Sequence, residues 1–81
     1  MTLKEKDEKV EKLFKLLLIA QSSIGKMADK MHVIEFESNF ESYDEFKMYC
    51  QNAKDECAKY EQQAVGAMKI FNSTLKELAE D

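Results

Sequence analysis

Apolar residues recur every seven positions along nearly the whole chain, and this periodicity restricts the fold more than any other feature. In the first part, one heptad position is held by Leu3, Val10, Leu17, Ile24 and Met31. The position three residues later is held by Lys6, Leu13, Ala20, Met27 and Ile34. Two apolar positions per heptad are typical of a long helix that packs against another helix. We therefore expect a helix over residues 3–32.

A second heptad array begins at residue 43. Its two positions are held by Tyr43, Cys50, Cys57, Ala64, Phe71 and Leu78, and by Phe46, Ala53, Tyr60, Ala67 and Thr74. The middle of this array is made of small side chains, which allow a neighbouring helix to approach closely. Ser38 with Glu41 and Ser42 with Glu45 each fit a capping box, in which a hydroxyl and a carboxylate satisfy free backbone N–H groups at a helix start, and we prefer Ser42. The second helix is therefore expected over 42–79, after a connection over 33–41 that folds back over the end of the helix pair.

The two arrays predict an all-α antiparallel hairpin with coiled-coil-like heptad packing. The chain contains no proline and only two glycines, so little interrupts the helices. Reversal of the chain near residue 37 would place Ile24 opposite Cys50 and Leu17 opposite Cys57. Large side chains would then face small ones through the middle of a single 81-residue domain.

Over residues 13–20, apolar side chains occupy most of the helix circumference. A single partner helix cannot cover that much apolar surface. A second surplus of apolar residues over 65–75 falls toward the same half of the hairpin. We expect these surfaces to pair two hairpins into a dimeric four-helix bundle. The predicted oligomer interface consists of Phe14, Leu16, Leu18, Ile19, Val65, Met68, Ile70 and Leu75.

Acidic and aromatic residues alternate over 35–49, at the expected tip of the hairpin. Aromatic side chains are enriched at binding hot spots, so this tip is a candidate surface for a partner protein. Its predicted residues are Phe36, Glu37, Phe40, Glu41, Asp44 and Glu45. The alternative is structural: the acids would stabilise the start of the second helix and the aromatics would close the bundle end.

The charge pattern argues against nucleic acid as a partner. The net charge is −4, and the twelve basic residues are all lysines that alternate with acids. The longest apolar run is too short to span a bilayer, and the amino terminus lacks a signal-peptide layout. We therefore expect no membrane partner and a cytoplasmic protein (in the host cytoplasm if the chain is viral).

No residue pattern indicates catalysis, a cofactor or a metal. His32 is the only histidine, and Cys50 and Cys57 are too far apart along one helix to form a disulfide with each other. The pattern predicts a non-enzymatic interaction module, a small acidic helical oligomer that binds and regulates or inhibits a larger protein. A phage-type inhibitor of host machinery is one form of this prediction. The alternatives are a chaperone or assembly subunit completed by a different chain, and a helical bundle that sequesters a small ligand.

Overall fold

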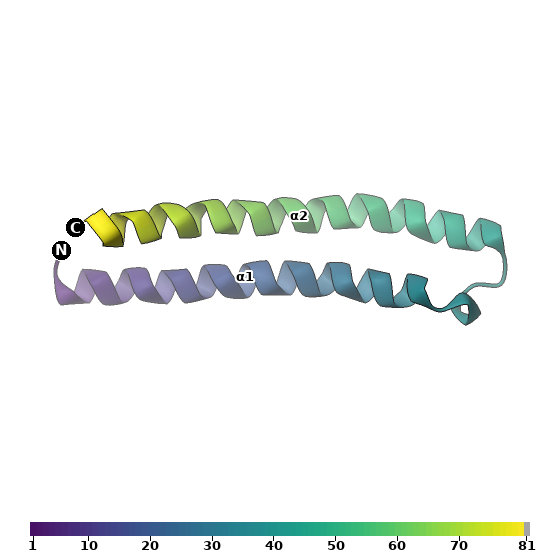
Figure 1. Cartoon of the computed structure of the whole chain (residues 1–81), viewed down its shortest axis with the longest axis horizontal. Coiled ribbons are helices and arrows are strands. Elements are labelled where there is room, and N and C mark those ends of the chain that lie inside the picture. The colour runs from purple at the N-terminus through teal and green to yellow at the C-terminus, as the bar shows by residue number, and fades with distance from the viewer. Residues whose placement is uncertain (81) are drawn as a thin grey trace.

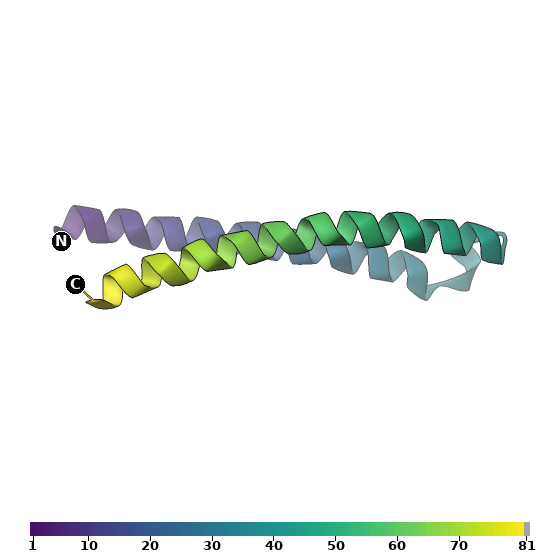
Figure 2. The ribbon, with the colours of Figure 1, turned by 90° about the horizontal axis from the view of Figure 1, so that it is seen from above.

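The computed structural model describes residues 1–80 and consists of two long antiparallel helices, as Figure 1 shows. Helix α1 spans Leu3–Glu35, a single 3₁₀ turn η1 spans Glu37–Asn39, and helix α2 spans Tyr43–Glu80. The molecule is a rod of 60 × 16 × 13 Å with both termini at one end, and the helices cross at a shallow angle (Figure 2). The predicted all-α hairpin is confirmed. Helix α1 continues three residues beyond the predicted boundary, so the connection is shorter.

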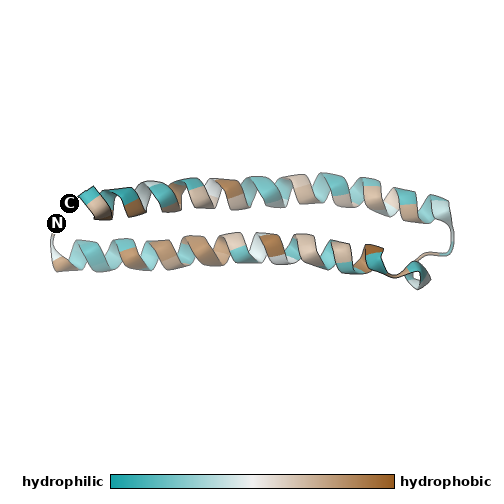
Figure 3. Cartoon of the chain, in the orientation of Figure 1, coloured by the Kyte–Doolittle hydropathy of each residue, from teal (hydrophilic) through white to brown (hydrophobic). Residues whose placement is uncertain are grey.

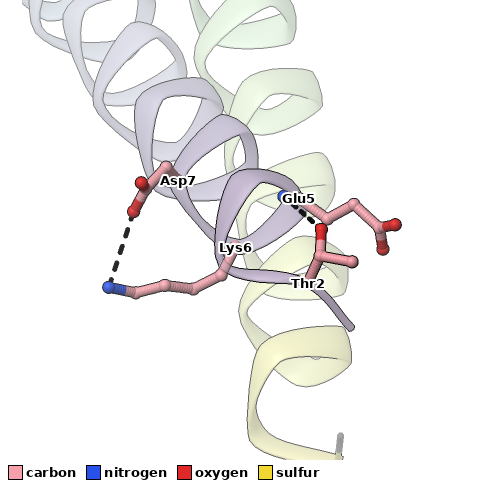
Figure 4. Close-up of polar contacts among 4 residues, drawn as sticks. All are labelled: Thr2, Glu5, Lys6 and Asp7. Atoms are coloured by element: carbon pink, nitrogen blue, oxygen red, sulfur yellow. Dashed lines mark hydrogen bonds and ion pairs between the residues drawn. The ribbon is translucent and has the colours of Figure 1, made fainter.

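Side-chain caps begin both helices. The Thr2 hydroxyl accepts a hydrogen bond from the Glu5 backbone N–H at 3.1 Å, and Lys6 and Asp7 form an ion pair on the same turn (Figure 4). At the second helix, the Ser42 hydroxyl accepts from the Glu45 N–H at 3.1 Å. Each cap satisfies one of the four N–H groups that a helix start leaves without a partner. The predicted start of the second helix at Ser42 is therefore confirmed.

The inner face of α2 follows the predicted heptads. Ala53, Ala67 and Thr74 are buried, and most other positions of the array are half-buried: Phe46, Cys50, Cys57, Tyr60, Ala64, Phe71 and Leu78. Tyr43 is the exception, because 72% of it is exposed. Its position in the first turn of α2 places it at the end of the helix pair where the connection reverses the chain.

The inner face of α1 differs from the prediction at one of its two heptad positions. The other position follows the prediction, because Ala20 is buried and Leu13, Met27 and Ile34 are half-buried. Ile24 and Met31, which were expected to face α2, are 56% and 52% exposed. Ser23 and Lys30, each one residue earlier, are buried and half-buried instead. Helix α1 carries apolar residues on several adjacent stripes, so a seven-residue period alone does not select the stripe that meets α2. Ser23 and Lys30 face α2 instead, where they meet the polar residues Gln63 and Glu56.

The register of the two helices also differs from the prediction. In the structure Lys30 lies beside Glu56. The expected reversal near residue 37 would instead place Leu17 opposite Cys57, the residue that follows Glu56. The longer α1, the η1 turn and residues 40–42 all precede α2, so the chain reverses later than expected. Neither α1 nor α2 is both long and apolar enough to cross a membrane within residues 1–80.

Candidate functional site

One face of the hairpin carries polar contacts that join the two helices. Lys9 forms an ion pair with Glu77, Lys30 forms one with Glu56, and the Ser23 hydroxyl lies 3.3 Å from the Gln63 side-chain oxygen. In each pair the two residue numbers add to 86, so all three pairs follow one register. The same register places Leu16 opposite Ile70. We call this set of eight residues the bridged face: Lys9, Leu16, Ser23, Lys30, Glu56, Gln63, Ile70 and Glu77.

Each polar member of the bridged face has a defined partner. Ser23 is only 2% exposed, and its hydroxyl is within reach of both the Ile19 carbonyl oxygen (3.0 Å) and Gln63. Its burial therefore leaves no polar atom without a hydrogen bond. The hydrogen bond to Glu56 raises the pKa of Lys30, and the hydrogen bond from Lys9 lowers the pKa of Glu77. Both shifts favour the charged forms that make the pairs.

Two predicted interface residues belong to this bridged face instead. Leu16 is 8% exposed and packs within the hairpin, so it is not part of an exposed surface. Ile70 occupies the opposite position on α2 and is 47% exposed. Ile19 precedes Ser23 by four residues and therefore lies on the same side of α1. The prediction placed Leu16 and Ile19 at an interface because stretch 13–20 is apolar all round, which leaves the inward direction undefined. It placed Ile70 there because Ile70 belongs to the apolar surplus over 65–75.

The opposite face of the hairpin is apolar in the half that contains the termini. Val10 directly follows the bridging residue Lys9, so it lies about 100° further round α1. On α2, Met68 lies five residues after Gln63, about 140° further round. We call this surface the apolar face and define it by Leu3, Val10, Phe14, Leu17, Met68 and Leu75. Hydrophobic bands in this half of both helices are visible in Figure 3.

Residues of the apolar face remain accessible to solvent. Leu3 is 80% exposed, Phe14 64% and Leu75 47%, while Val10, Leu17 and Met68 are half-buried. Two further predicted interface residues, Leu18 and Val65, are also exposed. Leu18 lies toward the outer side of α1, whereas Val65 precedes Met68 by three residues and therefore lies next to it on α2. Of the eight predicted residues, the structure therefore places Phe14, Met68 and Leu75 on the apolar face and Val65 beside it.

At the tip, an aromatic cluster joins the connection to α2. The Phe40 ring meets Phe46 edge-on at 5.3 Å between centroids and Tyr49 at 5.5 Å. The Asn39 side-chain amide donates to the Val33 carbonyl oxygen at 3.0 Å, which ties η1 to the end of α1. The connection therefore folds back over the end of the helix pair, as the sequence predicted.

An open cleft of about 870 Å³ lies beside this cluster. Its lining residues are Ile34, Glu35, Glu37, Ser38, Phe40, Glu41, Ser42, Tyr43 and Phe46. Three of the six predicted tip residues, Glu37, Phe40 and Glu41, are among them.

The other three tip residues, Phe36, Asp44 and Glu45, lie outside the cleft lining. The Glu45 carboxylate accepts a hydrogen bond from the Glu41 backbone N–H at 2.8 Å, so Glu45 is a helix cap. Asp44 and Glu45 both stand in the first turn of α2, where negative charge is favourable. Glu45 therefore has the position and a hydrogen bond of the kind that the structural alternative describes.

The predicted tip residues do not include six residues that line the cleft: Ile34, Glu35, Ser38, Ser42, Tyr43 and Phe46. A usable signal for two of them was present in the sequence. The cap at Ser42 puts Tyr43 and Phe46 three residues apart in the first turn of α2, where their side chains share a side. Their rings lie 6.1 Å apart in a stacked arrangement.

The remaining candidate ligands are dispersed. His32 is 73% exposed, with its Nδ1 atom 3.6 Å from a Glu35 oxygen, and Cys50 and Cys57 are free thiols. Over residues 1–80, no three histidine, cysteine or acidic side chains are grouped so that they could hold a metal ion. Comparisons with protein-family models, curated proteins and solved structures found no match for this chain.

Proposed function

We propose that this chain is a non-enzymatic protein-interaction module. In this proposal, two copies pair through their apolar faces into a four-helix bundle, and the bundle binds and regulates a larger protein. The observation that supports it most is the imbalance between buried and exposed apolar side chains. Leu16 is the only large one that is buried among the described residues, whereas thirteen large ones are exposed.

This imbalance makes a lone hairpin a weak folding unit. The other buried apolar residues are Ala20, Ala53 and Ala67, which remove little apolar surface from water. Small chains in general bury too little surface for a large margin of stability. A second copy would cover Leu3, Phe14 and Leu75, and each fully buried large apolar side chain contributes about 1.5–3 kcal/mol.

The experiment is a measurement of molar mass by light scattering over a wide range of protein concentration. The proposal predicts a species of about twice the 9.4 kDa chain mass, which dissociates on dilution. A folded monomer at every concentration would contradict self-association. A chain that is unfolded alone would also contradict it, and would favour a subunit completed by a different protein.

A further inference from the structure

We propose that the cleft at the tip binds a basic side chain of a partner protein, with an apolar neighbour of that side chain packed on the aromatic floor. This inference rests on the proposed function, because it concerns the larger protein that the module binds. It names the chemistry of the bound segment: a lysine or arginine next to apolar residues.

The charge of the cleft selects a cation. Glu35, Glu37 and Glu41 belong to its lining, and the lining includes no lysine. Glu37 and Glu41 form no ion pair within the described part of the chain. Unlike Glu45, which caps the helix, they keep their carboxylates exposed for a ligand. A positive side chain is therefore attracted to the cleft before contact.

The floor of the cleft fits the same ligand. Phe40, Tyr43 and Phe46 present aromatic rings, and ring faces attract ammonium and guanidinium groups as well as apolar side chains. The hairpin already uses such contacts, because Lys26 lies over Tyr60 at 5.4 Å and Lys30 over Tyr49 at 5.8 Å. Lys47 lies over Tyr43 itself at 5.9 Å, so Phe40 and Phe46 are the rings of the cleft without such a contact from residues 1–80.

The walls are held in place by hydrogen bonds within the connection. The Asn39 N–H donates to the Phe36 carbonyl oxygen and the Phe40 N–H to the Glu37 carbonyl oxygen, each at 3.1 Å. With the Glu45 cap on the Glu41 N–H, these bonds fix the backbone that carries the carboxylates. A preformed site loses less conformational entropy when a ligand binds.

The test is a titration of isotope-labelled protein, followed by amide NMR shifts, with a capped peptide of alternating leucine and arginine. A matched peptide carries citrulline, which has the shape of arginine without its charge. We expect the arginine peptide to shift the amides of residues 34–46 and to bind roughly tenfold more tightly than the citrulline peptide, with weaker binding at high salt.

Variants of the protein test whether the carboxylates of the cleft cause the preference for the arginine peptide. The double variant Glu37→Gln/Glu41→Gln should weaken arginine-peptide binding roughly tenfold. The matched control Glu8→Gln/Glu61→Gln removes the same charge from exposed positions away from the tip and should bind as the unchanged protein.

Equal binding of the two peptides, equal weakening by both variants, or no shift at the tip would overturn this inference. The proposed self-association is judged separately by molar mass. A dimer without peptide binding therefore contradicts only the cleft assignment, and a monomer that binds at the tip contradicts only the pairing.

Discussion

The bridged face and the apolar face are built by the same two helices, yet they differ in how well their residues are matched. On the bridged face, Lys9 and Lys30 each meet an acid of α2 and Ser23 meets Gln63. The same register places Leu16 opposite Ile70. On the apolar face, side chains such as Leu3 and Phe14 extend into solvent. Matched pairs restrict the helices to one arrangement, whereas exposed apolar groups favour association without selecting a register.

A shift of one heptad illustrates the difference. It would place Lys9 opposite Ile70 and Leu16 opposite Gln63, so that each charged or apolar group would lose its counterpart. The bridged face therefore specifies the fold of a single chain. The apolar face is the surface that we assign to contact between chains.

The largest expected effect comes from Leu16→Ala. This change removes the one large apolar side chain that is buried within residues 1–80, so we expect the free energy of unfolding to fall by about 2–3 kcal/mol. The control is Leu18→Ala, two residues away and 63% exposed, with an expected change within about 0.5 kcal/mol. Urea unfolding at one fixed protein concentration measures both. Equal losses for the two variants would mean that Leu16 is no more important to folding than an exposed leucine.

A smaller effect is expected from reversing the charges of a bridging pair. Lys30→Glu or Glu56→Lys alone places like charges together and should lower the melting temperature by a few degrees. The double variant should recover most of that loss. The control reverses the exposed pair of Glu11 and Lys15 on α1, which does not join the helices and should change little. If the double variant is no more stable than the single ones, the pair does not contribute to the register.

The smallest effect is a pH dependence of stability. Because the pKa of Glu77 lies below its usual value of 4.5, its contribution is complete above that pH and is lost as the pH falls through the lowered pKa. The pKa of Lys30 lies above its usual value of 10.5, so its contribution is complete below that pH and is lost as the pH rises through the raised pKa. The Glu77→Gln variant should therefore lose less stability in acid than the unchanged chain. Thermal unfolding from neutral to acidic pH measures the difference.

Features that depend on local sequence could be predicted. The caps at Thr2 and Ser42, the inner face of α2 and the folded-back connection all follow from nearby residues. On α2 the stripe of small and apolar residues is flanked by polar and charged residues such as Lys54, Glu56 and Glu61 up to residue 64, so its period selects one inward direction.

Features that depend on matching between helices could not be predicted in the same way. On α1, Leu16, Leu17 and Leu18 are consecutive, so apolar residues point in several neighbouring directions. The seven-residue period therefore fits more than one inward direction. The partner of Lys30 was also undetermined, because the register depends on where α2 begins relative to the end of α1. At the tip, the acidic and aromatic composition was evident, but the cleft depends on how η1 lies against the end of α1 and could not be located.

The most direct test of the difference between the faces is the molar mass of two variants that introduce the same charge on opposite sides of α1. Phe14→Glu lies on the apolar face, and Ile19→Glu lies on the side of the bridged face; both positions are exposed in the hairpin. Sedimentation equilibrium should give a helical monomer for Phe14→Glu and a dimer for Ile19→Glu. A dimer for Phe14→Glu with a monomer for Ile19→Glu would contradict the assignment of the apolar face to contact between chains.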